Sequence, residues 1–348
     1  MTQRLMLLDG FSLANRAFFA LPPLATTAGQ PTNAVYGMTM MLHKLLEESK
    51  PDYIIMAFDV MAPTFRHQEY KDYKGQRLKM EDTLRVQFPI IRELLAIFKI
   101  PIIEQAGYEA DDIIGTMAKK AARQGLSVEI ITGDRDAFQL VDSQITVLYT
   151  RKGITEVDRV DEKYIFDKYQ LKPPQLIELK SLMGDSSDNI PGVPGFGEKT
   201  ALKYLHQYGT LNEIYQHLQE ISKERDRGLL SENREQAYLS RHLAEIVTDV
   251  QLDVDPTECC HHQNYSKQEL IEFCNKFEFH SLARKLSDGT EVSKVKQLPE
   301  IISECQVIQE DELKRIVSVL KQEKNCYIQF FTSVANWIHV DFVGVGLG

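Results

Sequence analysis

Nine acidic residues stand at positions where they could hold metal ions. Asp9 ends the apolar run "LMLLD", Asp59 ends "IIMAFD", and Asp134 and Asp136 close "EIITGDRD". Parallel strands place their carboxyl ends at one edge of a sheet, where open α/β folds bind ligands, so these four carboxylates are expected to converge. The other acids, in "YEADD" at a predicted helix start and in "GDSSD" before a glycine-rich turn, are Glu109, Asp111, Asp112, Asp185 and Asp188.

An acid at a helix N-terminus has a simpler explanation, because a carboxylate caps the free amides there and complements the helix dipole. For any one of these acids alone that explanation is favoured. A whole cluster is different, since like charges packed together cannot all stay ionised without cations. Carboxylates without histidine or cysteine favour Mg²⁺ or Mn²⁺ over zinc. Two such ions about 4 Å apart make a site for hydrolysis of a phosphodiester or a phosphomonoester.

The segment "FRHQEYKDYKGQRLK" directly follows the Asp59 strand and combines basic residues with tyrosines. Its basic residues are Arg66, Lys71, Lys74, Arg77 and Lys79, and Tyr70 and Tyr73 are interleaved with them. Aromatic faces between cations suit a nucleic-acid strand whose bases stack while its phosphates are neutralised. The alternative is a solvated surface helix. The position of the segment, next to an acid at a strand end, favours nucleic-acid binding.

The stretch "GVPGFGEKT" at residues 192–200 looks like a nucleotide-binding loop. A P-loop needs a lysine directly after its second glycine, but Glu198 occupies that position and Lys199 comes one residue later. The segment before it has helical apolar spacing, whereas a P-loop follows a buried strand. What remains is a glycine-rich turn that opens a helix, which either binds phosphate of another kind or simply joins two packed helices.

The elements that must position these residues follow from the hydrophobic pattern. Up to about residue 150, apolar runs alternate with amphipathic stretches, which predicts an α/β fold with a mostly parallel sheet and helices on both faces. The expected strands are 4–9, 52–59 and 127–132, with 101–104 and 145–149 as further short strands, and the expected helices are 33–49, 81–100 and 110–125. Residues 160–285 have a helical pattern with breaks at proline and glycine.

The composition narrows the class of protein. A net charge of −10 over 348 residues argues against nonspecific binding of nucleic acid by a positively coated surface, although it allows local basic patches. Five cysteines without a C-x-x-C pair suit a reducing cytoplasm. The stretch "ECCHH" at 258–262 suggests zinc, but adjacent ligands cannot easily wrap one tetrahedral ion, so a polar connector is favoured. No apolar run reaches the roughly 18 residues of a membrane span.

Six ordered motifs resemble the flap endonuclease family, and in particular the N-terminal 5′-nuclease domain of bacterial DNA polymerase I. They are "LLDGFSLANRAFFAL", "AFD", "YKDYKGQR", "YEADDIIGT", "TGDRDAFQLV" and "GDSSDNIPGVPGFGEKTA", within about residues 1–288. The resemblance implies a nuclease with two Mg²⁺ ions, for which Mn²⁺ can substitute. It places Asp9, Asp59, Glu109 and Asp111 around the first ion and Asp112, Asp134, Asp136, Asp185 and Asp188 around or near the second.

The resemblance also implies roles for the basic segment and the glycine turn. Residues 65–95 correspond to a helical arch for the free 5′ end, in which Lys74 and Arg77 steady the scissile phosphate and Tyr73 stacks beside the cleaved nucleotide. Arg16 corresponds to an arginine near the strand entry. Residues 184–208 correspond to a helix-hairpin-helix that holds duplex phosphate with a carbonyl-bound K⁺. The remaining expected DNA contacts are Arg66, Lys71, Lys79, Gly192, Gly195, Gly197, Lys199 and Thr200.

The expected organisation is a catalytic core over residues 1–170, a helical DNA-binding part over 171–288, a linker over 289–300 and a further segment over 301–348. The last segment, with an expected helix at 311–321, resembles the truncated start of a 3′-5′ exonuclease domain in which Phe331 and Ser333 replace the catalytic acids. Proofreading is therefore not expected. No polymerase domain is present in these residues, and the abrupt stop suggests a truncated or partial sequence.

The leading hypothesis is a structure-specific 5′ nuclease of the bacterial cytoplasm, associated with the nucleoid. It is expected to act as a monomer, away from membranes, on DNA with 5′ flaps, nicks or RNA primers. One alternative is a noncatalytic junction-binding module, which the loss of an acid or of Lys74 would favour; none is lost. Another is a compact ribonuclease with a carboxylate site, or a phosphatase that acts on small substrates. Neither would need the glycine turn or the tyrosine-rich basic segment.

Overall fold

The computed structural model describes residues 2–77, 79–152, 156–259, 265–287, 328–332 and 342–347. The chain forms two compact units, Met1–Glu291 and Val292–Gly348. The first unit contains every residue discussed above as a metal ligand or DNA contact. In the described part of the chain, no helix has the length and apolar character needed to cross a membrane.

A six-stranded sheet forms the centre of the first unit, in the order β3-β2-β1-β4-β5-β6. The strands are β1 (Arg4–Asp9), β2 (Tyr53–Ala57), β3 (Ile102–Ile103), β4 (Ser127–Thr132), β5 (Ile145–Lys152) and β6 (Glu156–Val160). All neighbours pair in parallel except β5 and β6. The prediction of a mostly parallel sheet is confirmed. The antiparallel edge strand β6 was not expected; it follows β5 too closely for the crossover that a parallel partner requires.

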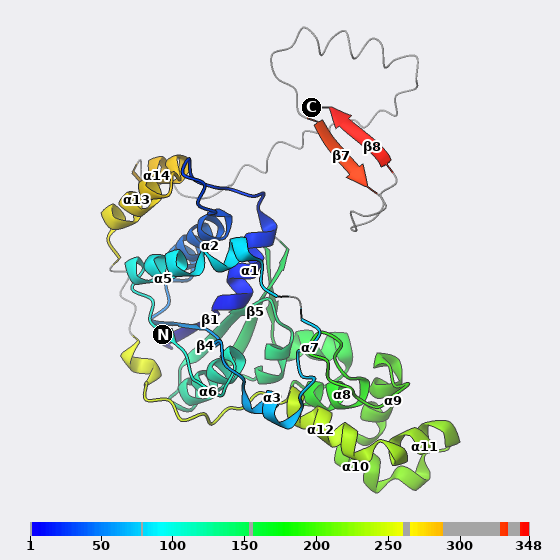
Figure 1. The fold of residues 1–348 in the computed structure, drawn as a ribbon. Helices are drawn as coiled ribbons and strands as arrows, with labels where there is room; N and C mark the ends of the chain where they lie inside the picture. The colour runs from blue at the N-terminus through cyan, green and yellow to red at the C-terminus, as the bar shows by residue number, and fades with distance from the viewer. Residues whose placement is uncertain are drawn as a thin grey trace. The chain divides into compact units, whose positions relative to one another are not determined.

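Helices cover both faces of this sheet (Figure 1). Leu5 and Leu7 of β1 point to one face and pack in a core with Ile114 and Met117 of α6 (Ala110–Arg123). The other face is covered by α1 (Gly10–Ala20), α2 (Asn33–Ser49) and α5 (Phe88–Ile97), which pack on one another in turn. Continuous apolar strands such as "LMLL" form here because a parallel sheet is buried on both sides.

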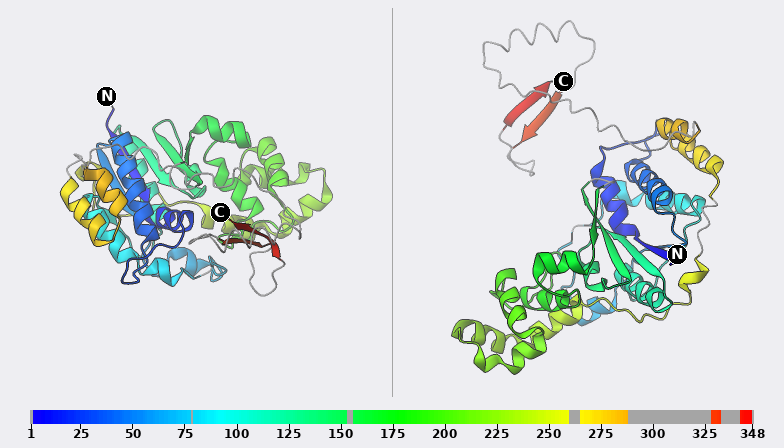
Figure 2. Two further views of the ribbon diagram at one scale, coloured as in Figure 1. Left: turned by 90° about the horizontal axis from the view of Figure 1, so that it is seen from above. Right: turned by 180° about the vertical axis from the view of Figure 1, so that it is seen from behind.

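A separate group of helices extends from the sheet (Figure 2). It comprises α7 (Glu162–Tyr169), α8 (Gln175–Met183), α9 (Glu198–Tyr208), α10 (Leu211–Gln216), α11 (Glu224–Glu232) and α12 (Arg234–Ala244). Its own core includes Leu182, Val193, Tyr204 and Ala237, so the helices and the turn between α8 and α9 form one packed body. Two further helices, α13 (Lys267–Lys276) and α14 (His280–Ser287), pack on each other, and α13 contacts α5.

The basic segment that was expected to form an arch contains α3 (Phe65–Glu69), a series of turns, α4 (Asp82–Arg85) and the start of α5. It is anchored to the helical group by a small apolar cluster of Tyr73, Ile190, Leu243 and Ala244. At its far end the buried Gln87 accepts hydrogen bonds from the Ala34 and Val35 amides at the start of α2. Both ends of the segment are thus fastened to other parts of the unit.

In the second unit the described residues form an antiparallel pair, β7 (Ile328–Thr332) and β8 (Phe342–Leu347). Phe331 lies on β7. The expected linker at 289–300, the expected helix at 311–321 and Ser333 lie outside the described residues.

Candidate active site

The acids at the strand ends lie together at the carboxyl edge of the sheet. Asp9, the last residue of β1, accepts hydrogen bonds from the Ser12 amide at 3.0 Å and from the Thr132 hydroxyl, at the end of β4, at 2.7 Å. Asp59 accepts from the Ala110 amide at 2.7 Å and so meets the N-terminus of α6. The expected convergence is seen at this edge: Asp9 ends β1 itself, and Asp59 and Asp134, which follow β2 and β4, lie close enough to interact with its charge.

The pKa values of these carboxylates show how crowded they are. Burial, together with the neighbouring Asp59 and Asp134 charges, raises the pKa of Asp9 to about 6. Burial likewise raises the pKa of Asp136 to about 7, although Lys180 opposes the shift. The pKa of Asp111 rises well above its ordinary value because of burial and the nearby charges of Asp134 and Asp9. Burial is the largest cause of all three shifts, and the neighbouring negative charges add to it.

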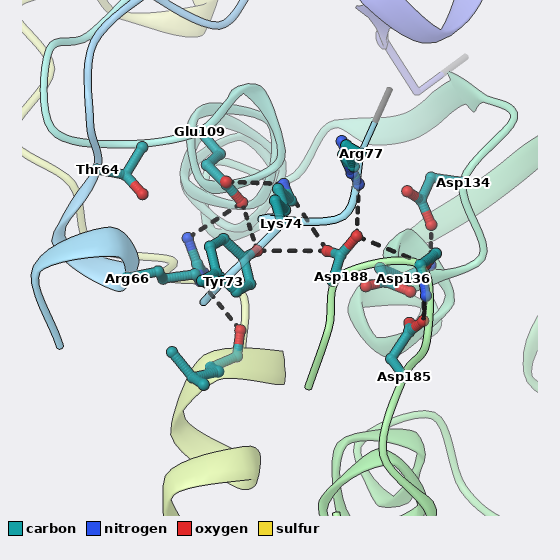
Figure 3. Close-up of polar contacts among 12 residues, drawn as sticks. Thr64, Arg66, Tyr73, Lys74, Arg77, Glu109, Asp134, Asp136, Asp185 and Asp188 are labelled. Atoms are coloured by element: carbon teal, nitrogen blue, oxygen red, sulfur yellow. Dashed lines mark hydrogen bonds and ion pairs between the residues drawn. The ribbon is translucent and has the colours of Figure 1, made fainter. Parts of the chain in front are cut away.

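Lys180, on α8, is a member of the site that the sequence patterns did not single out. Its ammonium group contacts Asp136 and lies 2.5 Å from Oδ2 of Asp185. Figure 3 shows these carboxylates meeting beside Asp134. Burial alone would raise the pKa of Asp185, but the ion pair with Lys180 and the hydrogen bonds from Ser187 lower it to about 2. The sequence signal was weak, because Asp185 lies beyond the end of α8 and five residues is not the spacing of one helix face.

A second group of side chains surrounds Glu109 (Figure 3). The Lys74 ammonium donates to Oε1 of Glu109 at 2.7 Å and lies 3.8 Å from Oδ2 of Asp188. Arg77 lies 2.5 Å from Oδ1 of Asp188. Lys74 has a φ of 55°, unusual for a residue other than glycine, and its amide donates to the Asp188 carbonyl at 2.9 Å. The expected phosphate-binding cations are therefore held at the edge of the acid cluster.

The donor set fits divalent metal ions, although the acids do not form a finished cage. Among the described residues, no three His, Cys, Asp or Glu side chains close on a common point. Instead, the ammonium groups of Lys74 and Lys180 lie between the carboxylates. The Asp111 side chain, on the first turn of α6, has neither a hydrogen bond nor an ion pair with any residue that the structure describes. Such crowded oxygen donors are suited to hard cations of the Mg²⁺ type.

Two of the expected site residues have other roles. Asp112 is completely buried, and its oxygens accept from Arg66 at 2.7 and 2.8 Å and from the amides of Glu109 and Val247. The expectation that Asp112 binds metal is wrong for this structure, because protein donors fill its acceptor positions. The expectation that Arg66 contacts DNA is also wrong, because its residue is only 2% exposed. Helix capping, the simpler explanation for an acid near a helix start, applies here, since Glu109 and Asp112 form a capping box.

Tyr73 does not present its ring for stacking. The residue is 3% exposed, and its hydroxyl donates to Oε2 of Glu109 at 3.0 Å. Burial and the charges of Glu109 and Asp188 raise its pKa above the ordinary value. The expectation that Tyr73 stacks on a nucleotide is therefore wrong for this arrangement, and the ring instead packs in the apolar cluster below the site.

Lys71 and Lys79 are exposed, as a DNA contact requires.

Arg16, on α1, lies beside the acids rather than among them. Its guanidinium donates to the Thr150 carbonyl and lies next to Gly133, which precedes Asp134. A side chain on Gly133 would come within 3.2 Å of this guanidinium. The position is compatible with the expected contact near the strand entry.

The glycine turn joins α8 to α9 as a helix-hairpin-helix would. Gly195 (φ 81°), Gly197 and Lys199 are exposed, whereas Thr200 is partly buried. Gly197 precedes the first turn of α9, where backbone amides have no acceptor within the helix. The expectation for Gly192 is wrong, because its amide donates to Ser240, its carbonyl accepts from Gln236, and the residue is buried. Gly192 instead packs on Gly184, whose amide nitrogen a Cβ would meet at 2.2 Å.

Two family models match most of the first unit. The N-terminal resolvase-like domain of 5′-3′ exonucleases matches residues 4–170, and the C-terminal SAM fold of 5′-3′ exonucleases matches residues 171–268. Among curated proteins, DNA polymerase I of Bacillus caldotenax is 44% identical over 286 residues, which are 82% of this chain and 32% of that protein. DNA polymerase I of Bacillus subtilis is 44% identical over 304 residues, 86% of this chain and 34% of that protein. The chain thus spans about a third of the length of these relatives.

Solved structures share the fold at low sequence identity. T5 5′-exonuclease, solved with bound divalent metal ions (zinc), superposes with a TM-score of 0.59 at 20% identity, over 82% of this chain and 99% of that one. The catalytic core of Rad2 in complex with DNA substrate superposes with a TM-score of 0.54 at 19% identity, over 82% of this chain and 91% of that one.

Proposed function

This chain belongs to the 5′-3′ exonuclease family and contains its nuclease domain, and on that basis we propose that it hydrolyses phosphodiesters where duplex DNA meets a 5′ single strand. The proposed substrates are 5′ flaps, nicks and RNA primers, and the proposed setting is replication and repair in the bacterial cytoplasm, near the nucleoid. We further propose that the protein works as a monomer. The relatives named DNA polymerase I and the Rad2 complex with DNA substrate support this choice of substrate.

One observation carries the proposal. Buried carboxylates with raised pKa values, Asp9 and Asp136 foremost, lie at the carboxyl edge of a parallel sheet with Lys74 and Arg77 beside them. Clustered acids require cations to stay ionised, and the adjacent basic side chains suit the substrate phosphate on which such cations act. A phosphatase for small substrates would have no use for the exposed basic residues of the segment that carries Lys74.

The proposed cofactors are two Mg²⁺ ions, for which Mn²⁺ can substitute. The residues that would hold them are Asp9, Asp59, Glu109 and Asp111 for one ion and Asp134, Asp136, Asp185 and Asp188 for the other. When bound, such ions activate the attacking water and stabilise the leaving 3′ oxygen. Lys74 and Arg77 neutralise the scissile phosphate as charge develops on it, and the capped start of α6 holds Glu109 in place for this task.

The duplex is proposed to lie on the turn between α8 and α9. Exposed Gly195 and Gly197 allow the backbone to come close to a phosphate, and the free amides at the start of α9 donate to it. A K⁺ ion on the carbonyl groups of the turn would add charge there. Lys199 offers a further phosphate contact that reads no base sequence.

The test is cleavage of an end-labelled 5′-flap duplex in Mg²⁺ and in EDTA, with the wild-type chain and with Asp134→Ala. Asp249→Ala, which removes an exposed aspartate outside the acid cluster, is the matched control. We expect cutting near the junction that needs Mg²⁺, is lost in Asp134→Ala and is kept in Asp249→Ala. Tight flap binding without cutting would refute the nuclease proposal and favour a noncatalytic binding module.

A further inference from the structure

The buried guanidinium of Arg66 uses every donor that it has. Its Nε donates to the Leu243 carbonyl at 3.0 Å, and Nη2 donates to the Glu245 carbonyl at 2.7 Å. The other three N–H groups reach two acids: Nη1 and Nη2 bind Asp112 as a fork at 2.7 and 2.8 Å, and Nη1 also reaches Oε2 of Glu109 at 3.5 Å. A lysine offers only three donors and no fork, so it cannot replace this set.

These contacts join three parts of the chain that are distant in sequence. Arg66 belongs to α3, in the basic segment, whereas Asp112 lies in the first turn of α6. Leu243 and Glu245 stand at the C-terminal end of α12, and the Val247 amide just beyond donates to Asp112 at 2.9 Å. Because the Glu109 amide also donates to Asp112, at 3.0 Å, the network reaches the backbone of a proposed metal ligand.

The first turn and the middle of α12 hold the glycine turn. Gln236, in the first turn of α12, donates to the Gly192 carbonyl at 2.6 Å, and Ser240 accepts from the Gly192 amide at 3.0 Å. The helix also packs along α8. A single short helix therefore connects the turn proposed to grip the duplex with the arginine that holds the start of α6. A helix of this length is stiff, so the two contacts keep a fixed separation.

We propose that Arg66 is a positioning residue, which fixes the register between the helix-hairpin-helix turn and Glu109 through α12 and Asp112. This inference rests on the proposed function. The contacts from Gly192 through α12 to Arg66 and Asp112 are called the link below. If the turn holds the duplex at one phosphate, the length of this link decides which phosphate reaches Lys74 and the acids. Loosening the link lets neighbouring phosphates enter and misplaces the reacting one.

The first test compares Arg66→Lys with the wild-type chain on a flap duplex. We expect kcat to fall about tenfold or more, since small misplacements at a reacting centre are costly, and cuts to spread to neighbouring phosphates. Flap affinity in EDTA should stay the same, because Arg66 is buried and touches no DNA. Arg159→Lys, which changes an arginine of β6 bonded to Glu129, is the control and should keep the wild-type pattern.

Gln236→Ala tests the other end of the same link and covers the case in which Arg66→Lys does not fold. This substitution removes one hydrogen bond from a partly buried side chain, and we expect a smaller spread of cutting positions in the same direction. Wild-type kcat and a single wild-type cutting position in a folded Gln236→Ala variant would overturn the proposal, as would the same result in a folded Arg66→Lys variant.

A readout without cleavage separates this proposal from the proposed nuclease activity. In EDTA, bound flap duplex should slow hydrogen exchange at the Glu109 amide in the wild-type chain and slow it less in Gln236→Ala. Equal slowing in both proteins would contradict the link even if both cut DNA. A wild-type chain that shows the slowing but does not cut would refute the proposed activity and leave the link supported.

Discussion

The ammonium nitrogen of Lys74 lies 2.7 Å from Oε1 of Glu109. The side chain proposed to neutralise the scissile phosphate and a carboxylate proposed to bind metal are thus bonded to each other. Burial alone would lower the pKa of Lys74, but Glu109 and Asp188 raise it, so the ammonium stays charged. When substrate and metal ions arrive, Lys74 can turn from Glu109 to the phosphate without a change in protonation.

Removal of this ammonium should abolish most of the cleavage. For Lys74→Met we expect single-turnover cleavage of a 5′ flap to fall by about 100-fold, because an electrostatic contact to the developing charge is lost. Lys71→Met, which removes an exposed lysine of the same segment, should weaken flap binding but cut almost as fast as the wild-type chain at saturating enzyme. An equal loss in both variants would point to the net charge of the segment rather than to the position of Lys74.

Lys180 should hold the acid cluster together in the absence of metal ions. Lys180→Met leaves Asp136 and Asp185 without their shared cation. Breaking a buried ion pair on one side costs about 3 kcal/mol, so we expect a lower free energy of unfolding in EDTA. Excess Mg²⁺ should restore part of the loss and stabilise the variant more than it stabilises the wild-type chain. Urea unfolding with and without Mg²⁺ measures this, with exposed Lys203→Met as control.

The same free energy of unfolding in urea for Lys180→Met and the wild-type chain in EDTA would show that the ion pair is not needed for stability. Equal stabilisation of the variant and the wild-type chain by Mg²⁺ would show that Lys180 does not take the place of a metal ion.

The stability of the metal-free chain should fall as pH rises, whereas the added stabilisation by Mg²⁺ should grow. Burial raises the pKa of Asp9 to about 6 and of Asp136 to about 7, above the ordinary 3.8. These groups bind protons more tightly in the folded chain, so their favourable contribution is complete below the unfolded value and is lost as pH rises to about 7. Divalent ions bind the ionised forms, so Mg²⁺ should stabilise the fold more at about pH 8 than at about pH 5. Thermal melting at both pH values checks this, and a Mg²⁺ shift independent of pH would exclude these groups as ligands.

Two glycines of the turn should respond differently to substitution. Gly192 has a φ of 62°, and an added Cβ would lie 2.2 Å from the Gly184 amide nitrogen, so Gly192→Ala should destabilise the fold by about 3 kcal/mol or more. Gly197 has a φ of −100° and open space around its Cβ, so Gly197→Ala should leave the free energy of unfolding nearly unchanged. Urea unfolding measures both, and equal effects would contradict the packing described for Gly192.

The alternation of apolar runs and amphipathic stretches was enough to predict the parallel sheet and most of its helices. Those patterns are local, because each residue's burial follows from the period of its own strand or helix. The position of an acid after an apolar run predicted the convergence of Asp9, Asp59 and Asp134 for a similar reason, since the end of a parallel strand has a defined place at the sheet edge.

The partners of individual charged side chains could not be predicted in this way. Arg66 and Lys74 are eight residues apart in one basic segment, and nothing in their spacing separates a buried positioning residue from a cation facing the site. Their difference depends on α12, whose end supplies two carbonyl groups to Arg66 from about 180 residues further along the chain. Asp111 and Asp112 are separated in the same way, since successive residues of a helix turn point in different directions.

The order of motifs along the chain already determined the family, the fold class and the edge of the sheet at which chemistry is expected, because residue type and local period carry that information. Which acids remain available for a metal ion, and which one is instead held by Arg66, was decided only in the tertiary structure. The physical reason is that a buried charge must find a partner, and that partner is chosen by packing between segments that the sequence keeps far apart.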